Sequence, residues 1–471
     1  MELTDIKKFI QKWNIENKEV FYQVARQIWE NPELAMQEYN SVDLLTDLLK
    51  KNEFVVEKGI AEMPTAFIAT YGKGFPVIGI NVEYDALPGL SQKSDFPKKE
   101  AITESAPGHG CGHNILGTAA VKAGIAIKEA LVKFGIEGTV KLIGAPGEEL
   151  CIGKPYLGKY GYLNGIDAFL DWHPWYYNRA DFDSCSAYFS VKYHFKGQTC
   201  HGNAPWHGKS ALDAAMLQAH AVEMLREHTY PGVPPLGANT INYTFTNTGP
   251  EFPSVVPDKA TAWYIGRINT TEEAENVVKR ITNCAKGAAI ATGTEVEVEF
   301  ITATHHKMPN KTLAEVLYKN FKEIGAPIFT QEEQEFVKEI QRQIGVSDTG
   351  LATEIRDFGG GYSCVCDTPE YSWNAPYATA WVSMGPENAG WHHWGVVACA
   401  AGSIGRKSMD VAAKIISSTA AELLFNPELV KKAKVELKDR LNGRNYECLL
   451  PEGYKPPIEI NSDIMKKYSK F

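Results

Sequence analysis

The sequence predicts an α/β fold in which a mixed sheet flanked by helices carries a smaller, inserted α+β domain. Along most of the chain, helical periodicity alternates with short apolar runs rich in β-branched residues, which is the pattern of a sheet covered on both faces. Between residues 188 and 306 the strands instead alternate residue by residue, as strands with one solvated face do. The length of 471 residues also favours two domains over one.

The first part of the chain is predicted to contain helices followed by buried strands. Helical spacing of apolar residues indicates helices over 4–13, 19–30, 41–51 and 114–133, the first capped by Thr4. Short apolar segments predict core strands over 65–72, 77–84, 139–146 and 166–174. These elements build the larger sheet and its helical layers.

The inserted part has its own order of elements. Strands are predicted over 188–197, 240–249, 260–268 and 295–306, with helices over 210–228 and 271–292. This order, strand, helix, strand, strand, helix, strand, is the split β-α-β unit of a ferredoxin-like domain. We therefore expect a first domain from 1–187 and 307–445, an inserted domain at 188–306 and a tail at 446–471.

Helical spacing resumes after the insertion. It predicts a helix over 313–325 and a long helical stretch over 397–425, and the Pro-rich, polar tail is expected to be extended.

Composition limits the possible partners and the compartment. The chain has 48 basic and 57 acidic residues, a net charge of −9, which argues against nucleic acid or an anionic membrane as partner. Its first residues lack an apolar core of signal-peptide length, and no run of about 18 apolar residues predicts a membrane span. The nine cysteines are scattered without a disulfide framework, so we expect a cytoplasmic protein.

Four clusters of ligand-capable side chains lie at predicted strand or helix boundaries. They are Cys111 with His113 and His109 upstream, Glu148 with Glu149, His173, and His392 with His393. Side chains at the carboxyl ends of neighbouring strands converge on one crevice. Thiol, imidazole and carboxylate groups bind zinc or manganese, and two ions about 3.5–4 Å apart need several protein ligands. Five candidates are Cys111, His113, Glu149, His173 and one of His392 or His393.

The adjacent glutamates suggest a division of labour. Neighbouring side chains on an extended segment diverge, so one glutamate is expected to bind metal and the other to act as a base towards water. Two alternatives, a zinc finger and a nucleophilic cysteine, fit the Cys111 segment less well. No second ligand pair occurs at zinc-finger spacing, and Cys111 and His113 are too close in sequence for a nucleophile and its base.

Several motifs resemble the dinuclear-zinc amidohydrolase and metallopeptidase family, which includes aminoacylases, glutamate carboxypeptidase and plant auxin-conjugate hydrolases. The motifs are "YDALPGLSQK", "GHGCGHNILGTAA", "GEELCIGKPYL", "DWHPW", "FKGQTCHGNAPWHGKSALDA" and "VVPDKATAWYIGR". They are most similar to the branch of p-aminobenzoyl-glutamate hydrolase B subunits, and the likeness runs from about residue 15 to 440. The resemblance implies a catalytic α/β domain with an inserted lid or dimerisation domain.

The resemblance also implies roles for individual residues. Cys111 would bridge two divalent ions (Zn or Mn), and His113, Glu149, His173 and His392 would complete their ligands. Glu148 would be the general base and acid. His392 is preferred to His393 because related branches carry His-Ser at this point.

Residues around the ligands complete the expected site. Asp85 would orient a ligand, and His201 of the inserted domain would polarise the scissile carbonyl, often across a dimer. Arg267 would pair with a substrate carboxylate, and His393 would lie in the surroundings of the ligands or the substrate.

Three segments depart from the family pattern. Ser254 replaces an asparagine, "CVCD" at 364–367 replaces Asp-Val-Gly-Asp, and "CIGKPYL" replaces a glycine-rich run. These changes leave the substrate, and the role of Cys364 and Cys366, open.

The function expected from these observations is that of a metal-dependent amidohydrolase. It would cleave the amide between an acyl group, aromatic or otherwise, and an amino acid, as in p-aminobenzoyl-glutamate. A dipeptidase or another N-acyl amino acid hydrolase of the same fold is the alternative, and a non-catalytic partner subunit is the alternative of a different class. A homodimer through the inserted domain is expected, with or without a second related subunit.

Overall fold

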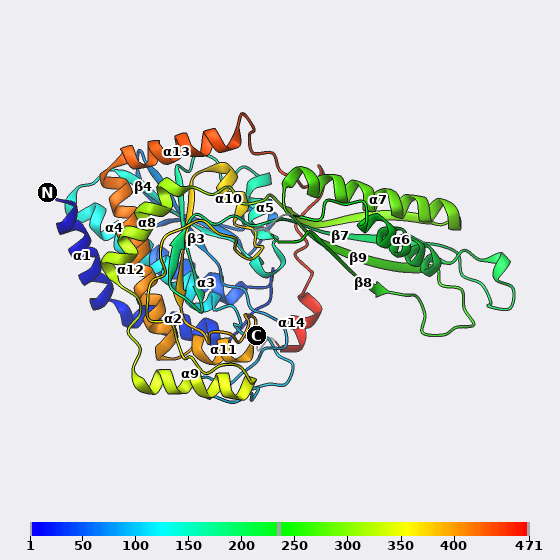
Figure 1. The fold of residues 1–471 in the computed structure, drawn as a ribbon, viewed down its shortest axis with the longest axis horizontal. Helices are drawn as coiled ribbons and strands as arrows, with labels where there is room; N and C mark the ends of the chain where they lie inside the picture. The colour runs from blue at the N-terminus through cyan, green and yellow to red at the C-terminus, as the bar shows by residue number, and fades with distance from the viewer. Residues whose placement is uncertain (1, 233–236, 469–471) are drawn as a thin grey trace.

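Two sheets organise the computed structural model, which describes residues 2–232 and 237–468 (Figure 1). Residue 1 of the expected first domain, 233–236 of the insertion and 469–471 of the tail lie outside the described residues. The larger sheet has the order β1 (Val55–Lys58), β2 (Phe67–Lys73), β4 (Gly138–Gly144), β3 (Val77–Val82), β5 (Ala168–Trp175), β11 (Tyr377–Ser383) and β6 (Arg179–Asp181). This mixed sheet confirms the predicted fold class.

Helices flank the larger sheet. They include α1 (Leu3–Glu16), α2 (Lys18–Glu30), α3 (Tyr39–Lys51), α4 (His113–Phe134), α8 (Lys311–Ile324) and α12 (Ser403–Phe425). The helix α4 lies between strands β3, β4 and β5 on one side and α1, α2 and α12 on the other. Because it has neighbours all round, α4 is apolar over most of its circumference, and even Lys122 and Lys128 are buried.

The strands at the centre of the larger sheet are parallel. β3 runs parallel to β4 on one side and to β5 on the other, and β11 runs parallel to β5. The carboxyl ends of these strands therefore lie along one edge of the sheet, where an open α/β sheet forms its ligand crevice.

The smaller sheet is inserted between β6 and α8, and Figure 1 shows it extending away from the larger sheet. Its antiparallel strands have the order β10 (Glu295–Thr304), β7 (Ala187–Lys196), β9 (Lys259–Ile268) and β8 (Thr240–Asn247). The helices α6 (Ala211–Arg226) and α7 (Thr271–Thr292) pack on this sheet and on each other. Strand β7 buries Phe189, Val191, Tyr193 and Phe195 at alternate positions, as the sequence pattern predicts. The order of elements is that of the split β-α-β unit.

The helical stretch predicted over 397–425 is two helices. The helix α11 (Trp394–Ala400) ends before Gly402, and α12 begins at Ser403. A Cβ at Gly402 would lie 1.9 Å from Oδ1 of the exposed Asp95, so the side chain of Asp95 lies close to the break between the two helices.

The C-terminal segment is not wholly extended, contrary to expectation. It contains α14 (Ser462–Tyr468), in which Met465 is buried and its sulfur accepts a hydrogen bond from the Leu34 amide at 3.5 Å. Further elements were not predicted from the sequence: the strands β1, β6 and β11, the helices α5 (Gly153–Lys159), α9 (Gln331–Ile344), α10 (Pro369–Asn374) and α13 (Pro427–Leu441), and the 3-10 turns η1 (Ile60–Glu62), η2 (Glu148–Leu150) and η3 (Pro205–His207). Within the described ranges, no helix is both long and apolar enough to cross a bilayer.

Candidate active site

The carboxyl ends of three neighbouring strands carry most of the predicted site. Asp85 follows β3, the pair Glu148 and Glu149 follows β4 in the turn η2, and His173 lies near the end of β5. Since β3 lies between β4 and β5, the three strand ends bring these side chains to one place.

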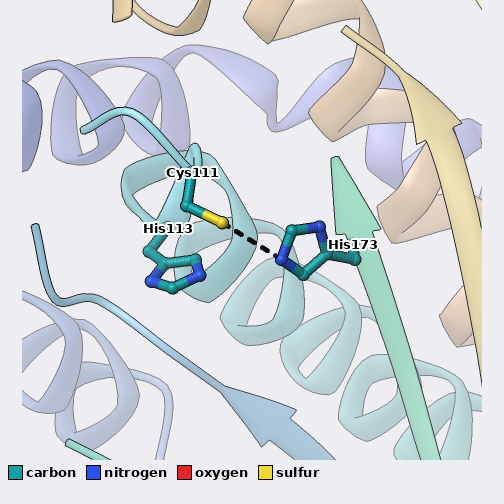
Figure 2. Close-up of side chains that lie close together, drawn as sticks. All are labelled: Cys111, His113 and His173. Atoms are coloured by element: carbon teal, nitrogen blue, oxygen red, sulfur yellow. Dashed lines mark hydrogen bonds between the residues drawn. The ribbon is translucent and has the colours of Figure 1, made fainter. Parts of the chain in front are cut away.

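A glycine-rich loop brings Cys111 and His113 to the same place. Gly112 has a φ of +79°, and a Cβ there would lie 2.9 Å from Cγ of Pro174, which follows His173 in β5. Only glycine combines this backbone conformation with so close an approach to β5. The helix α4 begins at the next residue, His113, so the loop and the first turn of α4 present the thiol and the imidazole together (Figure 2).

The candidate metal ligands form two groups that share one thiol. Sγ of Cys111 lies 3.4 Å from Nε2 of His173 (Figure 2), and Nε2 of His392 lies 3.2 Å from Oε2 of Glu149. One group is Cys111, His113 and His173, the other is Cys111, Glu149 and His392, and the ligand atoms within each group lie within 4.8 Å of one another. We call these five residues the donor cluster.

Neighbouring groups orient the ligands. Oδ1 of Asp85 lies 2.9 Å from Nδ1 of His113, and its Oδ2 accepts a hydrogen bond from the Glu149 amide at 3.0 Å. Nδ1 of His173 lies 2.7 Å from the carbonyl oxygen of Pro174, to which it donates. In both histidines Nδ1 is held by a partner and Nε2 faces the cluster. Imidazoles that bind metals are commonly oriented by such a bond on the other ring nitrogen.

The donor cluster fits divalent cations. Within the described residues, Nε2 of His113 and Oε1 of Glu149 are buried and have no hydrogen-bond partner. Leaving such groups without partners costs about 1–3 kcal/mol each, which a cation would offset. Burial lowers the pKa of His173 to about 3, so its imidazole is neutral, the form that binds metals.

Glu148 lies beside the donor cluster without belonging to either group that shares Cys111. Its Oε2 is 3.8 Å from Nε2 of His113. Burial raises the pKa of Glu148 well above its ordinary value, and the neighbouring carboxylates of Glu83 and Glu149 raise it further. A carboxyl group with a raised pKa is suited to both accept and release a proton near neutral pH.

Glu83 was not predicted from the sequence, and it forms a third possible ligand group with His113 and Glu148. Its Oε2 lies 3.5 Å from Nε2 of His113. Its Oε1 accepts a hydrogen bond at 2.7 Å from the fully buried Lys154, which also donates to Asp367. The available signal was the spacing of Glu83 and Asp85, two positions apart at the end of a strand and thus on one face.

Besides Asp85 and Glu148, three further predicted site residues lie outside the donor cluster. His201 is exposed in the inserted unit, where its Nδ1 accepts a hydrogen bond from the Asn203 amide at 3.1 Å. Arg267 is exposed on β9, 5.9 Å from the ring centre of Tyr188. His393 caps α11, because its Nδ1 accepts a hydrogen bond from the Gly395 amide at 3.2 Å, and His392 alone of the two joins the donor cluster.

An aromatic cluster borders the donor cluster at His173. The centre of the His173 ring lies 5.8 Å from that of Trp175 and 5.3 Å from that of Trp381. Trp175 also contacts Tyr176, Tyr177 and Trp391. The indole N–H groups of Trp175 and Trp381 have no hydrogen-bond partner in the described part of the chain. These five aromatic residues pack together beside the candidate ligand His173.

The chain is similar to proteins of known family. A family profile described as "Peptidase dimerisation domain" matches residues 186–292. The chain is 31% identical to the B subunit of p-aminobenzoyl-glutamate hydrolase from Escherichia coli, over 96% of this chain and 99% of that protein. It is 27% identical to Xaa-Arg dipeptidase of Mus musculus, over 89% of each chain.

A solved structure shares the fold. A dinuclear metal-binding peptidase of the M20 family from Bacillus subtilis has a TM-score of 0.53, with 17% identity, over 88% of this chain and 99% of that one. Together with the 31% identity across nearly the whole chain, these findings confirm the family inferred from the motifs. The chain belongs to the M20 peptidase family and is a hydrolase of amide bonds.

Proposed function

We propose that the protein removes an aromatic acyl group from an amino acid, as in p-aminobenzoyl-glutamate, with two divalent ions, Zn or Mn, in the donor cluster. The observation that carries this proposal is the meeting of two ligand groups at Cys111, with Glu148 beside them. In each group the ligand types suit zinc or manganese.

Each ligand group would hold one ion, and the Cys111 thiolate would bridge them. Burial raises the pKa of the Cys111 thiol well above its ordinary value, so its ionisation depends on the positive charge that it binds. When bound, the ions would polarise the scissile carbonyl and acidify the attacking water. Asp85 would keep Nε2 of His113 directed to its ion.

Glu148 would move the proton. Its carboxylate takes a proton from the water that attacks the carbonyl carbon, and it later gives that proton to the leaving nitrogen of the amino acid. Its partly exposed side chain, at 11%, leaves the carboxylate open to solvent while burial keeps its pKa raised.

His201 would act from the inserted unit of a partner copy. It is exposed, and it lies in the segment that matches a peptidase dimerisation domain. Nε2 of His201 would donate a hydrogen bond to the carbonyl oxygen as negative charge develops there. Arg267 of the same unit would pair with the substrate carboxylate through two parallel hydrogen bonds, and His393 would support His392 by fixing the start of α11.

The aromatic cluster favours an aromatic acyl group. Aromatic rings stack against one another with a gain of about 0.5–1.5 kcal/mol beyond their burial. The relative named for p-aminobenzoyl-glutamate supports the same substrate class.

Metal content measured together with activity tests the proposal. We expect about two ions per chain after reconstitution with zinc or manganese, and a lower content in Cys111→Ser. Cys284→Ser, which changes a cysteine of α7, is the matched control. Glu148→Gln should keep both ions and lose activity on p-aminobenzoyl-glutamate by about 10²–10⁴-fold. Full activity of Glu148→Gln with both ions bound would overturn the proposed mechanism.

A mixture of two inactive variants tests the role of His201. If His201 acts across the dimer, a mixed dimer of His201→Ala and Glu148→Gln contains one complete site. An equal mixture that exchanges subunits should then regain about a quarter of the wild-type activity. No recovery, with mixed dimers verified by mass, would place His201 in the site of its own chain.

The same experiments separate the alternatives. Turnover of Xaa-Arg dipeptides or N-acetyl amino acids in preference to p-aminobenzoyl-glutamate would indicate the dipeptidase or general N-acyl hydrolase. Two bound ions without turnover of any of these compounds would indicate a non-catalytic partner, to be tested by adding the second subunit. All nine cysteines are free thiols, which supports a location in the reducing cytoplasm.

A further inference from the structure

Three cysteines that the proposed reaction does not use lie near the junction of the two sheets. Cys185 lies in the segment that leads from β6 to β7, and Cys364 and Cys366 lie in the loop between α9 and α10. Cys185 is fully buried, Cys366 is half-buried and Cys364 is exposed.

The thiols of Cys185 and Cys366 lie close enough for each to shift the pKa of the other. The backbone fixes this contact. The Ser363 amide donates to the Ser184 carbonyl oxygen at 2.8 Å, and the Ser184 amide donates to the Gly361 carbonyl oxygen at 3.0 Å. The two segments therefore run side by side as a parallel bridge at Ser184 and Tyr362, which brings the two cysteines near each other.

A buried lysine lies against the same thiols. The Lys307 amide donates to the Cys185 carbonyl oxygen at 3.0 Å, and Nζ of Lys307 donates to Oγ of Ser363 at 3.2 Å. The neighbouring Cys366 thiol, and after it the positive charge of Lys307, lower the pKa of Cys185 despite its burial. A thiolate held beside a cation is the reactive form of cysteine.

Two segments connect the larger sheet to the inserted unit, and we call them the outgoing and the returning crossing. Cys185 lies in the outgoing crossing, between β6 and β7, and Lys307 lies in the returning crossing, between β10 and α8. Cys366 precedes Asp367, whose carboxylate accepts hydrogen bonds from the amide and the Nζ atom of Lys154. A covalent link between Cys185 and Cys366 would therefore tie the crossing to the loop that holds Lys154 beside Glu83.

We propose that Cys185 and Cys366 are a site of reversible oxidation, at which a hydroperoxide forms a disulfide that restrains the inserted unit and slows turnover. The Cys185 thiolate attacks the peroxide oxygen, which gives a sulfenic acid and, after protonation, one water. The Cys366 thiol then attacks the sulfenic sulfur, and its proton leaves with the hydroxyl group as a second water. Two thiols and one hydrogen peroxide give one disulfide and two waters.

Peptide mapping of the oxidised, metal-loaded full chain tests the chemical step independently of the proposed function. We expect hydrogen peroxide, followed by alkylation and proteolysis, to give a Cys185–Cys366 cross-linked peptide that dithiothreitol removes. Cys185→Ala and Cys366→Ser should each abolish it, and Cys364→Ser should keep it. A cross-link through Cys364, or oxidation without any cross-link in a chain that melts cooperatively, would overturn the pairing.

The expected slowing of turnover by the disulfide rests on the proposed function, and it is tested separately by measuring kcat. Oxidised wild-type protein should lose at least about fivefold in kcat and regain it with dithiothreitol, while Cys366→Ser keeps its activity under the same treatment. An unchanged kcat with the cross-link complete would overturn the restraint. If no substrate is turned over at all, the proposed function fails, and the mapped cross-link still decides the thiol pair.

Discussion

Asp85 joins the two ligand groups of the donor cluster, because its Oδ1 lies 2.9 Å from Nδ1 of His113 while its Oδ2 accepts a hydrogen bond from the Glu149 amide at 3.0 Å. His113 belongs to one group and Glu149 to the other. A single carboxylate after β3 therefore sets the positions of ligands that come from α4 and from η2.

Asp85→Asn should weaken metal binding. The amide offers one acceptor oxygen where the carboxylate offers two, so either His113 or the Glu149 amide loses its partner. We expect metal affinity to fall by about 10–100-fold, measured by competition with a chelator. Asp167→Asn is the matched control, since Asp167 is a carboxylate at the opposite, amino end of β5 that accepts from the Val77 amide. Equal losses in both variants would contradict a specific role for Asp85.

The neighbouring histidines should behave differently when replaced. His392 faces Glu149 at 3.2 Å, so His392→Ala should lose roughly half of the bound metal and most of the activity. His393 only caps α11, so His393→Ala should keep its metal and lower the free energy of unfolding by about 1 kcal/mol. Metal analysis and denaturant unfolding of the two variants measure this difference. A loss of metal in His393→Ala alone would reverse the assignment.

Replacement of Trp175 should change substrate preference. Trp175→Leu removes a ring that contacts both His173 and Trp391. We expect kcat/KM for p-aminobenzoyl-glutamate to fall by about threefold to tenfold, because a stacking partner is lost. N-acetyl-glutamate has no ring, so its kcat/KM should stay nearly constant. Tyr160→Leu changes an exposed tyrosine that belongs to neither the aromatic cluster nor the donor cluster, and it should affect neither substrate. A parallel loss for both substrates would show that Trp175 only supports the fold.

The ion pair between α1 and α12 should make stability depend on pH. Nζ of Lys7 lies 2.6 Å from Oε2 of Glu422, and both side chains are only 9% exposed. Burial alone would raise the pKa of Glu422, but the hydrogen bond and charge of Lys7 hold it below its ordinary value of 4.5. The pair therefore stabilises the fold above about pH 4.5, and this stability is lost as the pH falls through the lowered pKa.

Glu422→Gln should lower the free energy of unfolding by about 1.5–3 kcal/mol at pH 7, since it leaves the buried Lys7 paired only with the more exposed Glu323, 3.1 Å away. The difference from wild type should shrink at about pH 3, where Glu422 is itself protonated. Urea unfolding at the two pH values measures it. The exposed pair of Glu428 with Lys431 supplies the control, and Glu428→Gln should cost less than about 1 kcal/mol at either pH.

The donor cluster could be predicted from the sequence because its geometry follows from a topological rule. Parallel strands of an open sheet end at one edge, so chemically suitable residues after predicted strands are expected to meet. His173 and Glu149 fulfil this rule in β5 and after β4. His392, far along the chain, also joins the cluster, through a backbone with a φ of +62° that periodicity does not reveal.

The residues that were missed depend on long-range contacts. Lys154 resembles an ordinary surface lysine in the sequence, and its burial depends on Asp367, 213 positions away. Strand β11 is buried at all of its positions because it lies between β5 and β6, so it lacks the alternation that marks a half-exposed strand. The role proposed for His201 would depend on a second copy of the chain, whose position a single sequence does not reveal.

The two crossings between the sheets lie next to each other, joined by the hydrogen bond from the Lys307 amide to the Cys185 carbonyl oxygen. None of the seven strands of the larger sheet comes from the segment between them. The inserted unit is therefore a cassette whose ends nearly touch, and removing it would leave the order of the host strands unchanged. A chain built in this way can gain, lose or exchange the cassette while it keeps the donor cluster, since all five of its residues come from the host.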